Sequence, residues 1–189
     1  MLVTEDLIAL IERSEAMRLK ACAQASGGDL LEIGGGVAAF CGDGSPMTQV
    51  AAVGIRCEVS DEELDSIANH FAGRATQYEF KLSPLTDLSF RERVVRRAKS
   101  LPEFETFLVC DLTTLEPRGL DLDFRKVQPH EARDYAQRAV DRFCSRKEGP
   151  PGLVDVLAAA CVKEGSISYE VWMDDKPVAG CELGLCEGV

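Results

Sequence analysis

The sequence predicts an α+β protein in which mixed and antiparallel sheets carry flanking helices. Three observations support this fold class. Capping residues precede stretches with apolar residues at helical spacing, other stretches alternate as strands, and neighbouring strands are joined by short turns. The chain has 189 residues, of which 46% are hydrophobic, and this is enough to bury one large core or two small ones.

The first elements are a helix and a hairpin. Thr4 caps a helix that ends at 26–29 (SGGD), with an inward face made of apolar residues, namely Leu7, Leu10, Ile11, Met17 and Ala21. Residues 30–41 and 48–59 are predicted as two strands that form a hairpin around the turn at 42–46. The glycines at 34–36 precede a strand and not a helix, which favours close backbone approach in a hairpin over a nucleotide-binding loop.

Two capping boxes mark the next helices. Ser60 and Glu63 open a helix whose apolar residues recur at helical spacing, namely Leu64, Ile67, Ala68 and Phe71. A strand is predicted at 75–83. Ser89 and Glu92 form the second capping box, for a helix at 89–101 that turns Phe90, Val94, Ala98 and Leu101 inward, and residues 104–112 are predicted as a strand.

Residues 113–120 have the composition of a linker, and the pattern restarts after it. We therefore predict an accessory α/β segment at 1–112 and a second unit at 121–189. The second unit is predicted to contain a strand, two helices and two more strands, at 121–127, 128–143, 152–164, 166–173 and 176–186. Its last two strands form a hairpin around Asp174-Asp175. The first of these helices has Pro129 in its opening turn, and its apolar face comprises Ala132, Tyr135, Ala136, Ala139 and Phe143.

Charge and cysteine content narrow the class of protein. A net charge of −11 disfavours binding to nucleic acid or anionic lipid, and the basic stretch at 91–99 is expected to be a solvated helix face. The eight cysteines form no C-x-x-C pair, and His70 and His130 lack a recognisable catalytic or metal-binding motif, so no metal is expected. Without a secretory signal or a membrane-length apolar run, we predict a cytoplasmic protein with reduced thiols.

The second unit resembles the opening half of a GCN5-related N-acetyltransferase domain. The residues that carry this resemblance are DLDFRKVQPHEARDYAQRAVDRF (121–143) and YEVWMDDKPVAGCELGLCEG (169–188), which look like strand one with helix one and strands two and three of that family. In addition, GDGSPMTQVAAVGI (42–55) and YEFKLSPLTD (78–87) look like the segment that precedes the catalytic domain in a bacterial subgroup.

The resemblance implies transfer of an acetyl group from acetyl-CoA to an amine on a small molecule or peptide. It places acceptor contacts at Arg142, Phe143 and Trp172, and a carboxylate base at Glu182 or Glu187. Four of these residues have a simpler alternative: solvation for Arg142, packing in the sheet for Trp172, and an ordinary exposed carboxylate for Glu182 and Glu187.

The family binds acetyl-CoA through a glycine-containing loop after strand four, and no such loop occurs in this sequence between a strand and a helix. Gly188-Val189 looks like the turn into strand four, so cofactor contacts are expected beyond Val189, and an incomplete reading frame is the simplest hypothesis. We then expect the chain alone to be inactive. A non-catalytic binding or dimerisation module, which self-associates through an exposed strand edge, is the alternative, and an unrelated α+β role also stays open.

Overall fold

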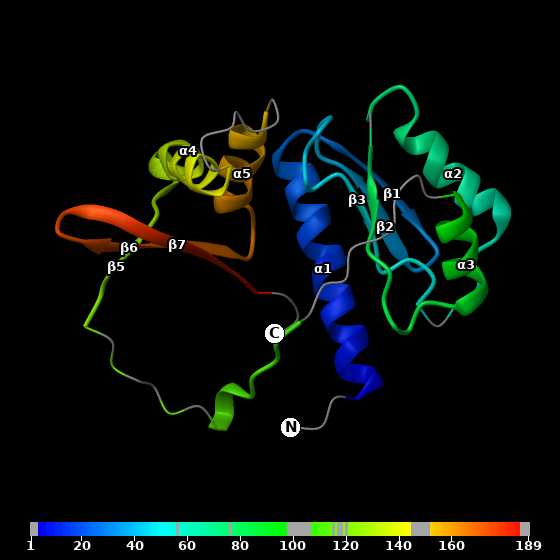
Figure 1. The fold of residues 1–189 in the computed structure, drawn as a ribbon, viewed down its shortest axis with the longest axis horizontal. Helices are drawn as coiled ribbons and strands as arrows, with labels where there is room; N and C mark the ends of the chain where they lie inside the picture. Colours follow the sequence, from blue (N-terminus) through cyan, green and yellow to red (C-terminus); the bar gives the residue numbers. More distant parts are fainter. Residues whose placement is uncertain are drawn as a thin grey trace.

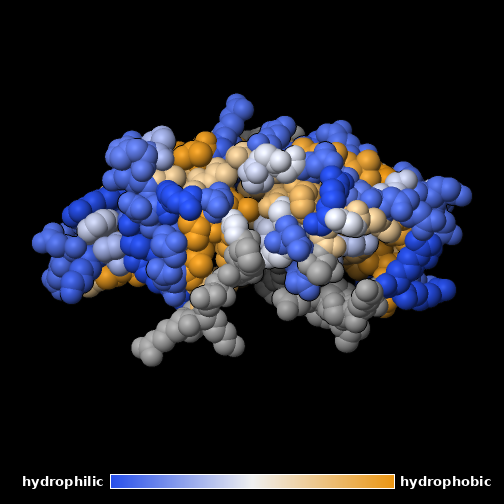
Figure 2. Space-filling view, turned by 90° about the horizontal axis from the view of Figure 1, so that it is seen from above, coloured by the Kyte–Doolittle hydropathy of each residue, from blue (hydrophilic) through white to orange (hydrophobic). Residues whose placement is uncertain are grey.

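The chain folds into two sheets, each packed against helices, with α1 lying between the two halves (Figure 1). The computed structural model describes residues 4–55, 57–75, 77–97, 107–114, 116, 119, 121–144 and 152–185. In the space-filling view, hydrophilic residues gather at both ends of the molecule and hydrophobic residues reach the surface between them (Figure 2). The described elements confirm the α+β fold class.

The N-terminal sheet has the strand order β1-β2-β3-β4, antiparallel except for the parallel pair β3 and β4. Its strands are β1 (Asp29–Ile33), β2 (Gly36–Phe40), β3 (Gln49–Ala51) and β4 (Glu79–Phe80). Its helices are α1 (Glu5–Ala25), α2 (Asp61–Phe71) and α3 (Leu88–Arg97). Helix α1 covers one face of this sheet, and α2 with α3 covers the other (Figure 1).

The C-terminal sheet is antiparallel with the order β5-β6-β7. Its strands are β5 (Asp123–Lys126), β6 (Ser166–Met173) and β7 (Lys176–Gly184). Helices α4 (Ala132–Phe143) and α5 (Leu153–Val162) lie in sequence between β5 and β6, and single 3-10 turns occur at η1 (Leu112–Thr114) and η2 (Pro129–Glu131). The predicted order of strand, helix, helix, strand, strand is confirmed.

The predicted caps of α1 and α2 and the predicted hairpin turn form in the structure. The Thr4 hydroxyl accepts a hydrogen bond from the Leu7 N–H at 3.2 Å and so caps α1. At the start of α2, the Glu63 N–H donates to the Ser60 hydroxyl at 3.1 Å, and the Ser60 N–H donates to the Glu63 carboxylate at 2.7 Å. Asp174 and Asp175 have φ values of 49° and 58°, the backbone of a two-residue hairpin turn.

The predicted strand at 30–41 is wrong as a single strand. Gly34 and Gly35, with φ values of 54° and 76°, turn the chain back so that β1 pairs with β2. Gly36 then lies against β3, and a Cβ atom there would be 2.3 Å from the Ala51 carbonyl oxygen. The glycine run therefore makes a tight turn followed by a close backbone contact, because only glycine meets both requirements without strain.

Other strand predictions are too long. Instead of 48–59, β3 spans three residues, because Ala52 has a φ of 60° and breaks the strand. Instead of 75–83, β4 spans two residues. The strand predicted at 104–112 is wrong for residues 107–112, which form coil and the start of η1, and residues 104–106 lie outside the described chain.

Helix α3 begins one residue before its predicted cap. The Asp87 carboxylate accepts hydrogen bonds from the Phe90 N–H at 3.0 Å and from the Ser89 hydroxyl, so Asp87 takes the capping role that we predicted for Ser89. Asp outcompetes Ser here because its charged oxygen accepts both donors. Phe90 and Val94 are buried as predicted, while Ala98 and Leu101 lie outside the described residues.

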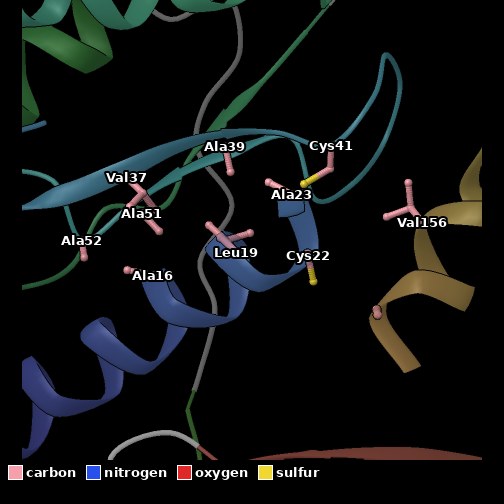
Figure 3. Close-up of a cluster of buried hydrophobic side chains, with 11 residues drawn as sticks. Ala16, Leu19, Cys22, Ala23, Val37, Ala39, Cys41, Ala51, Ala52 and Val156 are labelled. Carbon is pink, nitrogen blue, oxygen red and sulfur yellow. The ribbon is translucent and has the colours of Figure 1, made fainter. Parts of the chain in front are cut away.

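Helix α1 buries a different face from the predicted one. Its buried side chains are Ala9, Glu12, Ala16, Leu19, Cys22 and Ala23, whereas Met17 is 40% exposed. Small residues let the helix approach the sheet closely, and this decides the orientation over the larger apolar residues on the predicted face. Figure 3 shows the resulting cluster, in which α1 packs on β2 and β3 and is also contacted by Val156 of α5.

Candidate functional site

The layer between α4 and the C-terminal sheet contains a partly buried ion pair. Arg138 donates from Nε and Nη2 to the two carboxylate oxygens of Glu170, at 2.9 and 2.8 Å. The Glu170 side chain is 5% exposed, and the two hydrogen bonds from Arg138 replace the water that its carboxylate loses on burial. The bidentate geometry fixes α4 over the middle of β6.

Tyr135 lies directly on the backbone of β7. A Cβ atom at Gly180 would be 2.9 Å from the Tyr135 ring, so the ring occupies the space that a side chain would take. Burial raises the pKa of the Tyr135 phenol to about 12. This hydroxyl therefore stays protonated at neutral pH and can act as a hydrogen-bond donor.

A second polar cluster joins the end of α5 to the far end of the hairpin. The Lys163 ammonium donates to the Ala160 carbonyl at 3.1 Å, to the Ser166 hydroxyl at 3.0 Å and to the Glu182 carboxylate. The Ser166 hydroxyl also donates to Glu182 at 2.8 Å. The Lys163 side chain is 5% exposed, and all three of its protons have acceptors. Glu182 is therefore an ion-pair partner whose Oε1 atom is already occupied.

The residues assigned to acceptor binding lie mainly at the tip of the hairpin. The Arg142 guanidinium donates to the Pro177 carbonyl, and Pro177 pairs with Trp172 across the hairpin. The Arg125 guanidinium lies 4.3 Å from the centre of the Trp172 ring and covers it. At this end of the sheet, Arg125 therefore covers Trp172, and Arg142 binds the backbone of the residue paired with Trp172.

From its spacing we predicted that Phe143 belongs to the buried face of α4, and this prediction is wrong. Its side chain is 92% exposed, and the buried stripe consists of Ala132, Ala136 and Val140. Phe143 is the last residue of the helix.

Glu182 lies apart from the hairpin tip. It pairs with Ser168, four residues before Trp172 on β6, which places it about 13 Å along the strand from Trp172. Glu187 lies outside the described residues. The structure thus brings Arg142 and Trp172 to one end of the sheet and places Glu182 at the other.

Sequence reasoning missed Arg138, Glu170 and Lys163 as members of the polar layer. A weak signal exists for Glu170, because it occupies an inward position in the alternation of SISYEVWM (166–173). Its partner is 32 residues away in sequence, and a single sequence contains nothing that pairs them.

The basic stretch of α3 and the buried cysteine Cys41 have structural roles. Arg93 and Arg97 of α3 form ion pairs with Asp61 and Asp65 of α2 at 2.6 to 3.4 Å, which neutralises much of the basic helix. Among the described residues, no group of three His, Cys, Asp or Glu side chains could hold a metal ion. Burial raises the pKa of the Cys41 thiol to about 11, so this thiol is not a nucleophile at neutral pH.

The outer edge of β7 has no strand paired with it among the described residues. β7 is largely exposed, and the apolar side chains Val178 and Leu183 are about half exposed. Within the same part of the chain, no helix is both long enough and apolar enough to cross a bilayer. No protein-family model, curated protein or solved structure matches this chain.

Proposed function

We propose that this chain is the opening part of an N-acetyltransferase that transfers an acetyl group from acetyl-CoA to an amine on a small molecule or peptide. The observation that carries the proposal is the arrangement of the second unit. Two helices lie between the first two strands of an antiparallel sheet, and a hairpin joins the second strand to the third. Among the described residues, no strand pairs with the outer edge of β7.

The proposed reaction needs an uncharged amine, because only a free electron pair can attack the thioester carbonyl. A base or a water chain removes the amine proton, and backbone N–H groups stabilise the oxyanion that forms. In the family that the sequence resembles, these amides lie on strand four, which would pair with β7. Among the described residues, no glycine loop between a strand and a helix fits the diphosphate of acetyl-CoA, so these residues do not account for binding of the cofactor.

The acceptor side of this proposal is based on residues at the two ends of the C-terminal sheet. Arg142 and Trp172 mark the hairpin tip, while Glu182 is held by Lys163 and Ser166 at the other end. Because its Oε1 atom already accepts two hydrogen bonds, Glu182 is better suited to positioning a polar group than to removing a proton. A base for the amine is then expected outside these residues.

The test is thiol release from acetyl-CoA with a panel of primary amines, by the 189-residue chain and by the product of the full reading frame of its gene. We expect no turnover by the 189-residue chain and amine-dependent turnover by a product that includes a strand and a glycine loop after residue 189. The proposal is wrong if intact genomic DNA has a stop codon after codon 189, or if a longer product neither binds acetyl-CoA nor releases thiol.

A second candidate is a non-catalytic module that associates through β7. The open edge of β7 favours it, since unpaired strand edges pair readily with other strands. Light scattering on the purified 189-residue chain over a hundredfold range of concentration separates the candidates. A defined dimer supports the module, and a monomer throughout contradicts it.

A further inference from the structure

A segment with a strand-like composition lies as coil beside the far end of β7. Residues 107–111 (FLVCD) are rich in residues that favour strands, yet they form no strand and are exposed. Phe107 lines the same cleft as Gly184, the last residue of β7, and Figure 1 shows the segment passing this end of the strand. The outer edge of β7 has no partner among the described strands. A segment suited to a strand and an open strand edge therefore lie next to each other.

The position of Phe107 indicates the register in which this segment can pair with β7. In an antiparallel pair, each step forward on one strand is a step back on the other, so Phe107 opposite Gly184 places Cys110 opposite Cys181. Among the described cysteines, these two are the exposed ones. Opposite residues of antiparallel strands have Cα atoms about 4.5 or 5.5 Å apart, within the range of about 4.4–6.8 Å that a disulfide requires. This register therefore brings the two exposed thiols to bonding distance.

The same register places two exposed apolar side chains together. Tyr135 of α4 covers Gly180, so Leu183, three residues further along β7, lies on the opposite face of the sheet. Leu108 comes opposite Leu183, and these side chains are now 94% and 50% exposed. Their contact removes apolar surface from water, so side chains as well as backbone hydrogen bonds favour the pairing.

The chain is long enough to allow this pairing. The C-terminal sheet has the order β5-β6-β7, so a fourth strand beside β7 lies three strand spacings from β5, which is about 14 Å. The ten residues at 113–122 connect the segment to β5 and can span up to about 33 Å. The segment can therefore pair with β7 of its own chain while β5 stays in place.

We propose that residues 107–111 form a redox-controlled fourth strand of the C-terminal sheet, held on β7 by a disulfide between Cys110 and Cys181. In the reduced chain the segment is coil, as in this structure. The proposal goes beyond both candidate functions, because it involves neither acetyl transfer nor a partner chain. Once bridged, the segment occupies the edge that each candidate function assigns to another strand.

The oxidant in this proposal is a peroxide. The thiolate of one cysteine attacks hydrogen peroxide and becomes a sulfenic acid, with release of hydroxide. The thiol of the other cysteine then attacks the sulfenic sulfur, the S–S bond forms, and water leaves. In total, two thiols lose two electrons and two protons, and one peroxide is reduced to two waters.

The test treats the reduced 189-residue chain with an equimolar amount of hydrogen peroxide and maps disulfides by mass spectrometry of tryptic peptides. We expect a bridge between Cys110 and Cys181 in a chain that stays monomeric on a non-reducing gel. The tryptic peptide with Cys181 also contains Cys186, so variants must separate them. Cys181→Ser should abolish the bridge, and the matched control Cys186→Ser should leave it. Absence of this bridge, or a dimer linked through these cysteines, overturns the proposal.

The register has a test of its own. Cys181→Ser combined with Leu183→Cys moves one thiol to a diagonal position, about 7–8 Å from Cys110 and too far for a disulfide, so the bridge should be lost. Adding Cys110→Ser and Leu108→Cys places both thiols opposite each other again and should restore it. A bridge of equal yield in the first combination contradicts a fixed register and overturns the proposal.

Hydrogen exchange then tests whether the bridged segment is a strand. The amides of residues 107–111 should exchange more slowly in the oxidised chain than in the reduced chain, because pairing with β7 protects them. Cys110→Ser treated with the same amount of peroxide is the control and should show no slowing. A bridge without added protection would show that the thiols meet without strand pairing, and this result also overturns the proposal.

Discussion

The replacement Leu19→Ala tests whether the two halves of the protein share one core. Leu19 is fully buried, at 0% exposure, in the cluster that joins α1, β2 and β3 to Val156 and Ala160 of α5. If this cluster couples the halves, its loss should destabilise the C-terminal sheet although Leu19 lies in the N-terminal helix. If it does not, only the N-terminal half should respond.

The magnitude follows from the atoms removed. Leu19→Ala deletes three buried carbons, worth about 2.4 kcal/mol at about 0.8 kcal/mol each, and the cavity raises the cost to about 3 kcal/mol. With a urea dependence of about 2 kcal/mol per molar, the unfolding midpoint should fall by about 1.5 M. Val156→Ala, which deletes two carbons from the same cluster on α5, should cost about 2 kcal/mol.

The assay uses urea unfolding followed by two probes. Trp172 is the single tryptophan and lies on β6, so its fluorescence reports the C-terminal sheet, whereas far-UV circular dichroism reports both halves. We expect both probes to shift together in Leu19→Ala. The matched control Leu88→Ala, at a position 64% exposed, should shift the midpoint little. An unchanged Trp172 transition in Leu19→Ala, with a shifted dichroism transition, would refute a shared core.

Three further predictions concern local features. Ser60→Ala removes the capping box of α2 and should cost about 1 kcal/mol in the free energy of unfolding by urea. Gly36→Ala places a Cβ atom 2.3 Å from a carbonyl oxygen of β3, and because that backbone cannot move aside cheaply, the thermal midpoint should drop by several degrees. Burial, together with the charge of Arg74, lowers the pKa of His70 from its usual 6.5, so the unfolded state binds the proton more readily and stability should fall as pH drops below about 6.5.

Each of these predictions has its own control. Ser66→Ala, inside α2, should change stability by only a few tenths of a kcal/mol, and an equal loss in both serine variants would contradict a capping effect. Gly184→Ala has open space around its new Cβ and should be tolerated where Gly36→Ala is not. His70→Asn should flatten the pH dependence of stability between pH 5 and 7, and an unaltered slope would show that other groups cause it.

The local elements could be predicted because their signals lie within a few residues. The Thr4 cap, the Ser60 capping box and the Asp174-Asp175 turn each depend on contacts between residues at most three apart, and all three form as predicted. The candidate site was predictable only in part. The positions of Arg142, Trp172 and Glu182 on the helix and hairpin followed from the pattern, but their separation into two ends of the sheet follows from strand register.

By itself, the sequence determined the fold class and the order of elements in the second unit, since periodicity and capping act within single helices and hairpins. Only the tertiary structure decided which face of α1 is buried, that Glu170 is paired with Arg138, and that Lys163 holds Glu182. The physical reason is that burial and ion pairing are set by partners far away in the chain. Many pairings of such partners satisfy the same local pattern, and packing selects one of them.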